Sequence, residues 1–303
     1  MSALLEDPPS HFTVENTLAK ELLKLSFKDR TAIEEEIHGV RCLAVDETPE
    51  LLRRTLREFD SELIGRKEGD PENHLLRNVI SISSISSAEA EAAKAACYLN
   101  DQDVRLRFLR CECFAVTKAV QRFINFLELT SELFGDFVAE RPIQLSDFKT
   151  KEEKTALQNS RIQYLPFRDR SGRRVCASVG TCGFHLDIAL RTKIITYLYW
   201  VVSEDIETQR KGVVLVGWAS NERGDDTMWE KSIRPELQTK LYAYHVKIHY
   251  SRTVRITSQH FCCKDTPFFR ALTALYLFGL DSYHRSVYKT HFGTSLCFLN
   301  LLR

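Results

Sequence analysis

The clearest hydrophobic pattern in the chain is a run of four aliphatic residues, Val213 to Val216, between Gly212 and Gly217. The run has no polar position and is too short for a helix, so it predicts a strand that is covered on both faces, as in a parallel sheet. The segment before it, Asp187 to Arg210, is long and rich in Leu, Ile, Tyr and Trp, and it predicts a helix. A helix that leads into a buried strand is half of a βαβ unit, and the pattern therefore indicates an α/β domain.

Helical periodicity dominates the first half of the chain. One helix is expected from Asp29 to Gly39, where the glycine suits the position after a helix end. Another begins at Pro49, and a third follows Phe114; both repeat apolar residues at intervals of three and four. The apolar stripes are Leu52, Leu56, Phe59 and Leu63 in the former, and Val116, Ala119, Val120, Phe123, Ile124 and Leu127 in the latter. We therefore expect a partly flexible helical extension over residues 1–85 and a helical module over residues 86–150.

The second half of the chain, residues 155–303, alternates between short β patterns and helices. The charged stretch Asp147–Lys154 separates it from the helical module, and the turn Asp169–Gly172 lies between two strand-like pieces. Further strands are expected at Val254–Thr257 and Ser286–Phe292, and further helices at Pro235–Ile248, Asp265–Phe278 and Ser295–Leu302. The predicted fold class is α/β: a helical N-terminal module followed by a mixed, mainly parallel sheet that is flanked by helices.

The composition excludes several classes of protein. A net charge of +1 over 303 residues gives no general reason to expect nucleic acid as a partner. No apolar run reaches the roughly 18 residues of a membrane span, and the N-terminus lacks the pattern of a secretory signal. Nine scattered cysteines favour reduced thiols over a disulfide framework, and we therefore expect a cytoplasmic protein.

Residues suited to metal binding or catalysis do not form a known motif. The candidates are Cys111-x-Cys113, the adjacent pair Cys262-Cys263 after His260, and the helical pair His245 and His249. The first pair has the wrong spacing for a zinc knuckle, the second points to opposite faces of a strand, and the third lacks the glutamate of a zincin motif. Nucleophile-elbow, P-loop and dinucleotide-binding motifs are absent from the sequence. We therefore expect no metal, no cofactor and no enzyme activity, although a cysteine–histidine pair that meets only in space stays open.

Five segments stand in an informative order: Val104–Arg110 followed by Phe114–Val120, then Leu165–Val175, Gln209–Val216, Tyr250–Ile256 and Thr266–Arg270. From about Ala88 onward, this order resembles the CRAL-TRIO (Sec14-like) family of lipid-binding proteins. The first segment is similar to the family's helical module and the second to the hairpin that opens its lipid-binding domain. The third is similar to the family's helix-to-strand step, and the last to the start of its mobile gate helix.

The resemblance implies an apolar pocket between the sheet and a gate helix, with a bound lipid or other hydrophobic ligand. The predicted pocket residues are Val213, Leu215, Val254, Ile256, Tyr197 and Trp200, and those of the gate helix are Phe268, Phe269, Leu272, Leu275 and Tyr276. Some positions depart from the family pattern. Gly217 stands where members often have Asp, and Thr273 where phosphatidylinositol-binding members tend to have Lys, so the resemblance gives no support for recognition of an inositol head group.

Four arginines surround the predicted turn: Arg168, Arg170, Arg173 and Arg174. They are either an ordinary solvated hairpin or a contact to anionic lipid, worth about 1 kcal/mol per cation near a charged surface. The predicted function is the binding, and transfer between membranes, of a hydrophobic small molecule or phospholipid, with transient peripheral membrane contact. The alternative is a non-catalytic protein-interaction scaffold, such as a module that binds small GTPases. Phosphoinositide, tocopherol-like and retinoid-like molecules all suit an apolar pocket.

Overall fold

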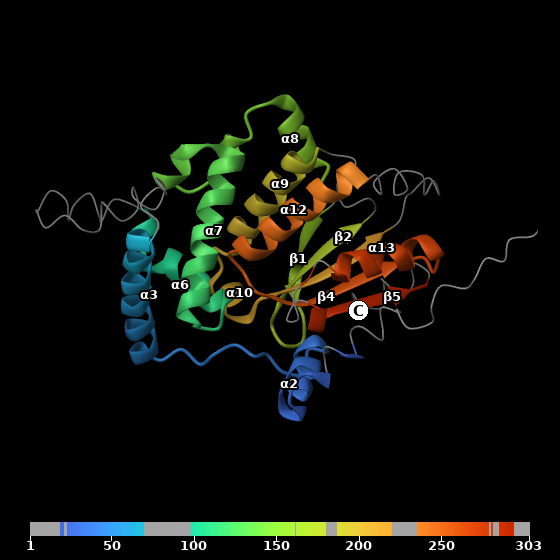
Figure 1. Cartoon of the computed structure of the whole chain (residues 1–303), viewed down its shortest axis with the longest axis horizontal. Helices are drawn as coiled ribbons and strands as arrows, with labels where there is room; N and C mark the ends of the chain where they lie inside the picture. The colour runs from blue at the N-terminus through green and yellow to red at the C-terminus, as the bar shows by residue number, and fades with distance from the viewer. Residues whose placement is uncertain are drawn as a thin grey trace, which may run out of the picture.

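The computed structural model describes residues 19–20, 23–69, 98–160, 162–179, 187–219, 235–278, 280 and 285–293. These residues form a five-stranded sheet with helices packed against it and a helical module at one side (Figure 1). The α/β class and the mainly parallel sheet predicted from the sequence are confirmed.

The sheet has the strand order β1-β2-β3-β4-β5. The strands are Ile162–Arg168, Arg174–Val179, Val213–Ala219, Ile256–Cys263 and Tyr288–Phe292. β1 is antiparallel to β2, and all other neighbours are parallel. β3 is the central strand and has a parallel partner on each side, which confirms the strand predicted from the aliphatic run. Such a strand is covered on both faces, so it needs no polar side.

The helices that connect the parallel strands are α9 (Ile188–Val202), α10 (Ile206–Lys211), α12 (Pro235–Ser251) and α13 (Pro267–Phe278). α9, α12 and α13 pack on one face of the sheet (Figure 1). This face carries Leu215, Gln259 and Tyr288, which are register partners on β3, β4 and β5. The strands follow one another in spatial order, and right-handed crossovers between them place all three helices on the same side. We call this the helix-covered face. Val175, Val214, Val216 and Trp218 form an apolar cluster on the opposite face.

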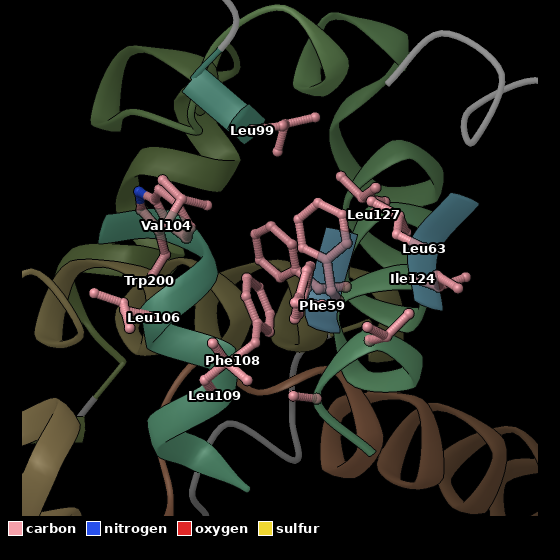
Figure 2. Close-up of a cluster of buried hydrophobic side chains, with 14 of the residues drawn as sticks. Phe59, Leu63, Leu99, Val104, Leu106, Phe108, Leu109, Ile124, Leu127 and Trp200 are labelled. Carbon is pink, nitrogen blue, oxygen red and sulfur yellow. The ribbon is translucent and has the colours of Figure 1, made fainter. Parts of the chain in front are cut away.

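A second core lies in the helical module. α3 (Pro49–Gly69), α6 (Gln102–Cys111) and α7 (Val116–Phe134) enclose Phe59, Phe108 and Phe123, which are fully buried. Phe59 and Phe108 lie near the middle of this core in Figure 2. The apolar stripes predicted in α3 and α7 both face this core. Trp200 of α9 stacks on Phe126 of α7 with 5.3 Å between ring centroids, so the module and the α/β part share side-chain contacts. Short 3₁₀ helices lie at Tyr98–Asn100, Asp136–Ala139 and Leu145–Asp147.

The N-terminal extension contacts both parts of the molecule. α2 (Phe27–Ile37) packs against β4, below the sheet in Figure 1, whereas α3 belongs to the core of the helical module. Between them, Glu47 forms two hydrogen bonds of 2.8 Å with the guanidinium of Arg110. The segment 27–69 therefore contacts the sheet through α2 and the helical module through Glu47 and α3.

Some predicted elements differ from the structure. The helix expected over residues 187–210 is two helices, because the Asp205 carboxylate accepts a hydrogen bond from Glu207 N and starts α10. The strand expected at 254–257 is β4, which runs from Ile256 to Cys263. The charged stretch 147–154 contains the start of α8 (Lys151–Gln158), where Thr150 and Glu153 form a capping box. The helix expected at 295–302 lies outside the described residues.

Candidate ligand site beneath helix α13

Local hydrogen bonds define the start of α13. Pro267 occupies the first helical position, which suits a residue without an N–H group, and Phe269 N donates to Thr266 Oγ1 at 3.3 Å. The Arg270 guanidinium forms hydrogen bonds of 2.7 and 3.0 Å with Asp265. The helix therefore begins immediately after the chain leaves β4, at a short connection over residues 264–266.

The inner side of α13 is mostly apolar. Phe269, Thr273 and Leu277 are spaced by one helical turn, and their exposed fractions are 0, 1 and 2%. Phe269 packs with Cys263 at the end of β4, and Leu277 packs with Tyr288 on β5. α13 thus runs back across the β4–β5 half of the sheet, on the helix-covered face.

A polar contact interrupts this apolar packing at Tyr276. Its hydroxyl accepts a hydrogen bond from Gln259 Nε2 of β4 at 3.0 Å. Its ring centroid lies 4.7 Å from that of His245 on α12 and 5.2 Å from that of Tyr288 on β5. Burial raises the pKa of Tyr276, because the phenolate would lose its hydration, and the Gln259 hydrogen bond opposes this shift. Elements α12, α13, β4 and β5 therefore meet at one tyrosine.

The structure describes part of the predicted gate helix. Phe269 and Tyr276 both face the sheet or α12, as described above. The side chains of Phe268, Leu272 and Leu275 lie outside the described residues. Thr273, where the family pattern has a lysine, is buried, and its hydroxyl donates to Phe269 O at 2.8 Å.

Four of the six predicted pocket residues lie on the helix-covered face of the sheet: Val213, Leu215, Val254 and Ile256. Val213, Val254 and Ile256 are 0, 0 and 2% exposed and form one cluster with side chains of α9 and α12. Leu215 is half-buried and is the register partner of Gln259. Leu215 therefore connects the cluster under α9 and α12 to the polar contact under α13.

Tyr197 and Trp200, which were also predicted to line the pocket, lie on another side of α9. Trp200 belongs to the core of the helical module, and the ring centroid of Tyr197 lies 5.3 Å from that of Phe148. Residues three apart share one side of a helix, and here that side faces α7 and its loops. Both residues therefore pack with the helical module and not with the other four predicted pocket residues.

The four arginines at the β1–β2 turn are held by contacts within the chain. Arg173 is 2% exposed and bonds to Asp169 at 2.6 Å. Arg168 and Arg174 both bind the carboxylate that caps α10. Arg170 is exposed and donates to the main-chain carbonyls of residues 38 and 39. Burial removes Arg173 from any membrane contact in this conformation, and Arg170 is the most accessible of the four.

The structure brings together one close pair of titratable side chains that no pattern in the sequence predicts. His260 Nδ1 and His291 Nε2 lie 3.0 Å apart on the neighbouring strands β4 and β5. Burial, followed by the effect of His291 and nearby cations, lowers the pKa of His260 to about 3. The two residues are 31 positions apart, and only strand pairing brings them together.

The metal and thiol candidates from the sequence do not assemble. Cys262 and Cys263 join different clusters, as expected for adjacent residues on a strand. Burial raises the pKa of Cys111, which disfavours the nucleophilic thiolate. In the part of the chain that the structure describes, no three His, Cys, Asp or Glu side chains form a group that could hold a metal ion.

Two hollows are lined by described residues. An open groove of about 890 Å³ lies between α3 and the start of α7, where three arginines and two glutamates line it. Its charged residues are Arg54, Arg57, Arg66, Glu58 and Glu62. A second hollow, too narrow to admit a water molecule, lies between α7, α9 and α12 and borders Thr196 and Arg252, and neither hollow is lined by residues of α13.

No protein-family model matches the chain, and no curated protein matches it. Among the helices of the described ranges, none has both the length and the apolar character needed to cross a bilayer.

Proposed function

We propose that the chain binds a hydrophobic small molecule or a phospholipid between α13 and the sheet, and that it carries this ligand between membranes without catalysing a reaction. The observation that supports the proposal is the position of α13. The helix lies over the β4–β5 half of the sheet, packs on it through Phe269 and Leu277, and bonds to Gln259 through Tyr276. It follows β4 through a three-residue connection. The CRAL-TRIO-like order of sequence segments favours the same role.

The free energies involved explain why a movable helix suits such a carrier. A buried CH₂ group gains about 0.8 kcal/mol, so a sixteen-carbon chain gains roughly 12 kcal/mol in an apolar site relative to water. A bilayer offers nearly the same gain, and extraction is therefore close to neutral at equilibrium. The obstacle is exposure during transfer, which a hinged apolar helix removes. On this proposal the protein is cytoplasmic and touches membranes transiently.

The test is to purify the full chain and to identify what it carries. Native mass spectrometry reports a bound mass, and solvent extraction followed by chromatography identifies it. The expected result is one lipid or lipid-like molecule per chain, or uptake of one from mixed phospholipid liposomes. A protein that is purified empty and takes up no lipid from such liposomes would overturn the proposal.

The groove between α3 and α7 favours the alternative, a protein-interaction scaffold. The groove is open, and Arg54 and Arg66 pair there with Glu58 and Glu62. Arg57 gives the lining a net positive charge, which suits an acidic protein surface. If this is the function, a purified small GTPase should bind the chain, and Arg57→Glu should weaken that binding. Binding that is unchanged in Arg57→Glu would exclude the groove as the interface.

A further inference from the structure

The turn between β1 and β2 holds the N-terminal extension through a serine hydroxyl. Ser171 Oγ donates a hydrogen bond of 2.6 Å to Gly39 O, just beyond the C-terminal end of α2. Gly39 has a φ of +67°, and a Cβ added there would lie 3.1 Å from Nη2 of Arg173 and 3.6 Å from Ser171 Oγ. The turn and the residues after α2 are therefore in close contact and leave little room between them for a larger group.

Arginines lie on both sides of this serine in the sequence. Relative to Ser171 they occupy positions −3, −1, +2 and +3, and they are Arg168, Arg170, Arg173 and Arg174. Arg170 is exposed, and Ser171 is half-buried. Protein kinases select their substrates partly by charge patterns around the accepting hydroxyl, and an acidic substrate cleft suits a serine with arginines on both sides. The proposed lipid binding beneath α13 does not involve any of these residues.

We propose that Ser171 is a phosphorylation site for a protein kinase that selects basic residues on both sides of the serine, and that the phosphate releases the N-terminal extension from the turn. Ser171 Oγ attacks the γ-phosphorus of ATP, the bond from that phosphorus to the β–γ bridging oxygen breaks, ADP leaves, and the hydroxyl proton passes to the kinase. That proton is the one donated to Gly39 O, so transfer takes place when the turn and the extension have separated locally. This inference does not depend on the proposed function.

The phosphate opposes renewed contact in two ways. The ester oxygen of phosphorylated Ser171 has no proton to donate to Gly39 O, and a charge of about −1.5 to −2 is placed beside that carbonyl oxygen. The phosphate also competes for Arg170, whose guanidinium donates long hydrogen bonds of 3.4 and 3.5 Å to the carbonyls of His38 and Gly39. A charge-assisted hydrogen bond to phosphate is stronger than a bond to a carbonyl. The modified turn therefore binds the segment after α2 less strongly.

The test begins with the purified full chain, the catalytic domain of protein kinase C, and ATP with Mg²⁺. A synthetic peptide of residues 165–177 shows that the kinase is active, and tandem mass spectrometry locates the phosphate in the chain, which we expect on Ser171. The matched control site is Ser61, which is exposed but lies between Asp60 and Glu62 and has no basic residue within three positions. Absence of phosphate from Ser171 in the chain, or equal phosphorylation of Ser61, would overturn the site.

Hydrogen exchange followed by mass spectrometry measures the release. Peptides over residues 27–43 should exchange about tenfold faster after phosphorylation, the factor that corresponds to the loss of one strong hydrogen bond, whereas peptides over β3 should not change. Ser171→Ala loses the hydroxyl but cannot carry the phosphate. It should exchange at the same rate with and without kinase treatment, and more slowly than the phosphorylated chain. Unchanged exchange over residues 27–43 in the phosphorylated chain would overturn the release.

Linkage requires the reverse effect as well, because release and phosphorylation favour each other. Gly39→Ala keeps every residue around Ser171 but disturbs the docked position, since alanine is strained at a φ of +67° and its Cβ would crowd Arg173. This variant should be phosphorylated about tenfold faster than wild type. Gly135→Ala is the matched control, because it places similar strain, at a φ of +105°, in the helical module, and it should keep the wild-type rate. Equal rates for wild type and Gly39→Ala would overturn the coupling.

Discussion

Glu36 and Arg255 lie 219 positions apart and form a buried ion pair, in which Nη1 of Arg255 donates to both carboxylate oxygens of Glu36 at 2.9 and 2.7 Å. Their side chains are 3 and 4% exposed. Leu43 N donates a third hydrogen bond to the same carboxylate at 2.8 Å. This pair fixes α2, in the N-terminal extension, to the residue that precedes β4.

Glu36→Gln should destabilise the protein by about 3–5 kcal/mol, because a buried guanidinium then lacks its counterion. The measurement is the free energy of unfolding in urea, followed by circular dichroism. The matched control is Glu35→Gln, since Glu35 lies 4.0 Å from Arg41 and both side chains are well exposed. That control should change stability by less than about 1 kcal/mol. Equal losses in the two variants would contradict a special role for the buried pair.

Thr196→Val should stabilise the protein by about 1–2 kcal/mol, because it removes a buried hydroxyl of α9 that has no hydrogen-bond partner. Thr192→Val, one turn earlier in α9, is the control. Its hydroxyl donates to Ile188 O at 2.7 Å, and its loss should cost about 0.5–1.5 kcal/mol. Thermal unfolding of both variants gives the comparison, and a destabilised Thr196→Val would show that the hydroxyl is satisfied.

His260 should make stability fall as the pH is lowered. Its pKa is about 3 in the folded protein against an ordinary value of 6.5, so between these values the unfolded chain binds a proton that the folded protein does not. Between these two values, His260 should lower the free energy of unfolding by up to about 1.4 kcal/mol for each unit by which the pH falls. Urea unfolding across this pH range should give a shallower dependence for His260→Gln. If the free energy of unfolding of wild-type protein and of His260→Gln falls equally with pH, groups other than His260 cause the acid sensitivity.

Thr273→Cys should lock α13 onto the sheet under oxidising conditions. Burial raises the pKa of the Cys263 thiol at the end of β4, and the Thr273 hydroxyl lies close enough to oppose this shift, so a thiol at position 273 should be able to form a disulfide with Cys263. The oxidised variant should load lipid about tenfold more slowly or worse, because opening of a lid gates access to a closed site. Reduction should restore the rate, and wild-type protein treated with the same oxidant serves as control.

A free-thiol count on the oxidised Thr273→Cys sample establishes that the bond has formed. If the cross-linked protein loads lipid as fast as the reduced protein, α13 is not the lid. The proposed function would then require another route to the sheet.

Local patterns predicted those features that depend on which side of an element is buried. The apolar stripe from Leu52 to Leu63 faces a core in the structure, because residues three and four apart share one side of a helix. The aliphatic run of β3 lies at the centre of the sheet because it has no polar position to expose. The helix break at Asp205 also had a local cause, a capping carboxylate, which the apolar pattern on either side obscured.

The sequence by itself determined that this is an α/β protein with a helical module, a buried central strand and an apolar helix after β4, because hydrophobic periodicity is a local property. The tertiary structure alone decided that Trp200 faces Phe126, that His260 meets His291, and that Tyr276 bonds to Gln259 beneath α13. These contacts depend on strand register and on how one helix packs on another. Strand register and helix packing depend on the whole set of long-range contacts, so they cannot be predicted from a short stretch of sequence.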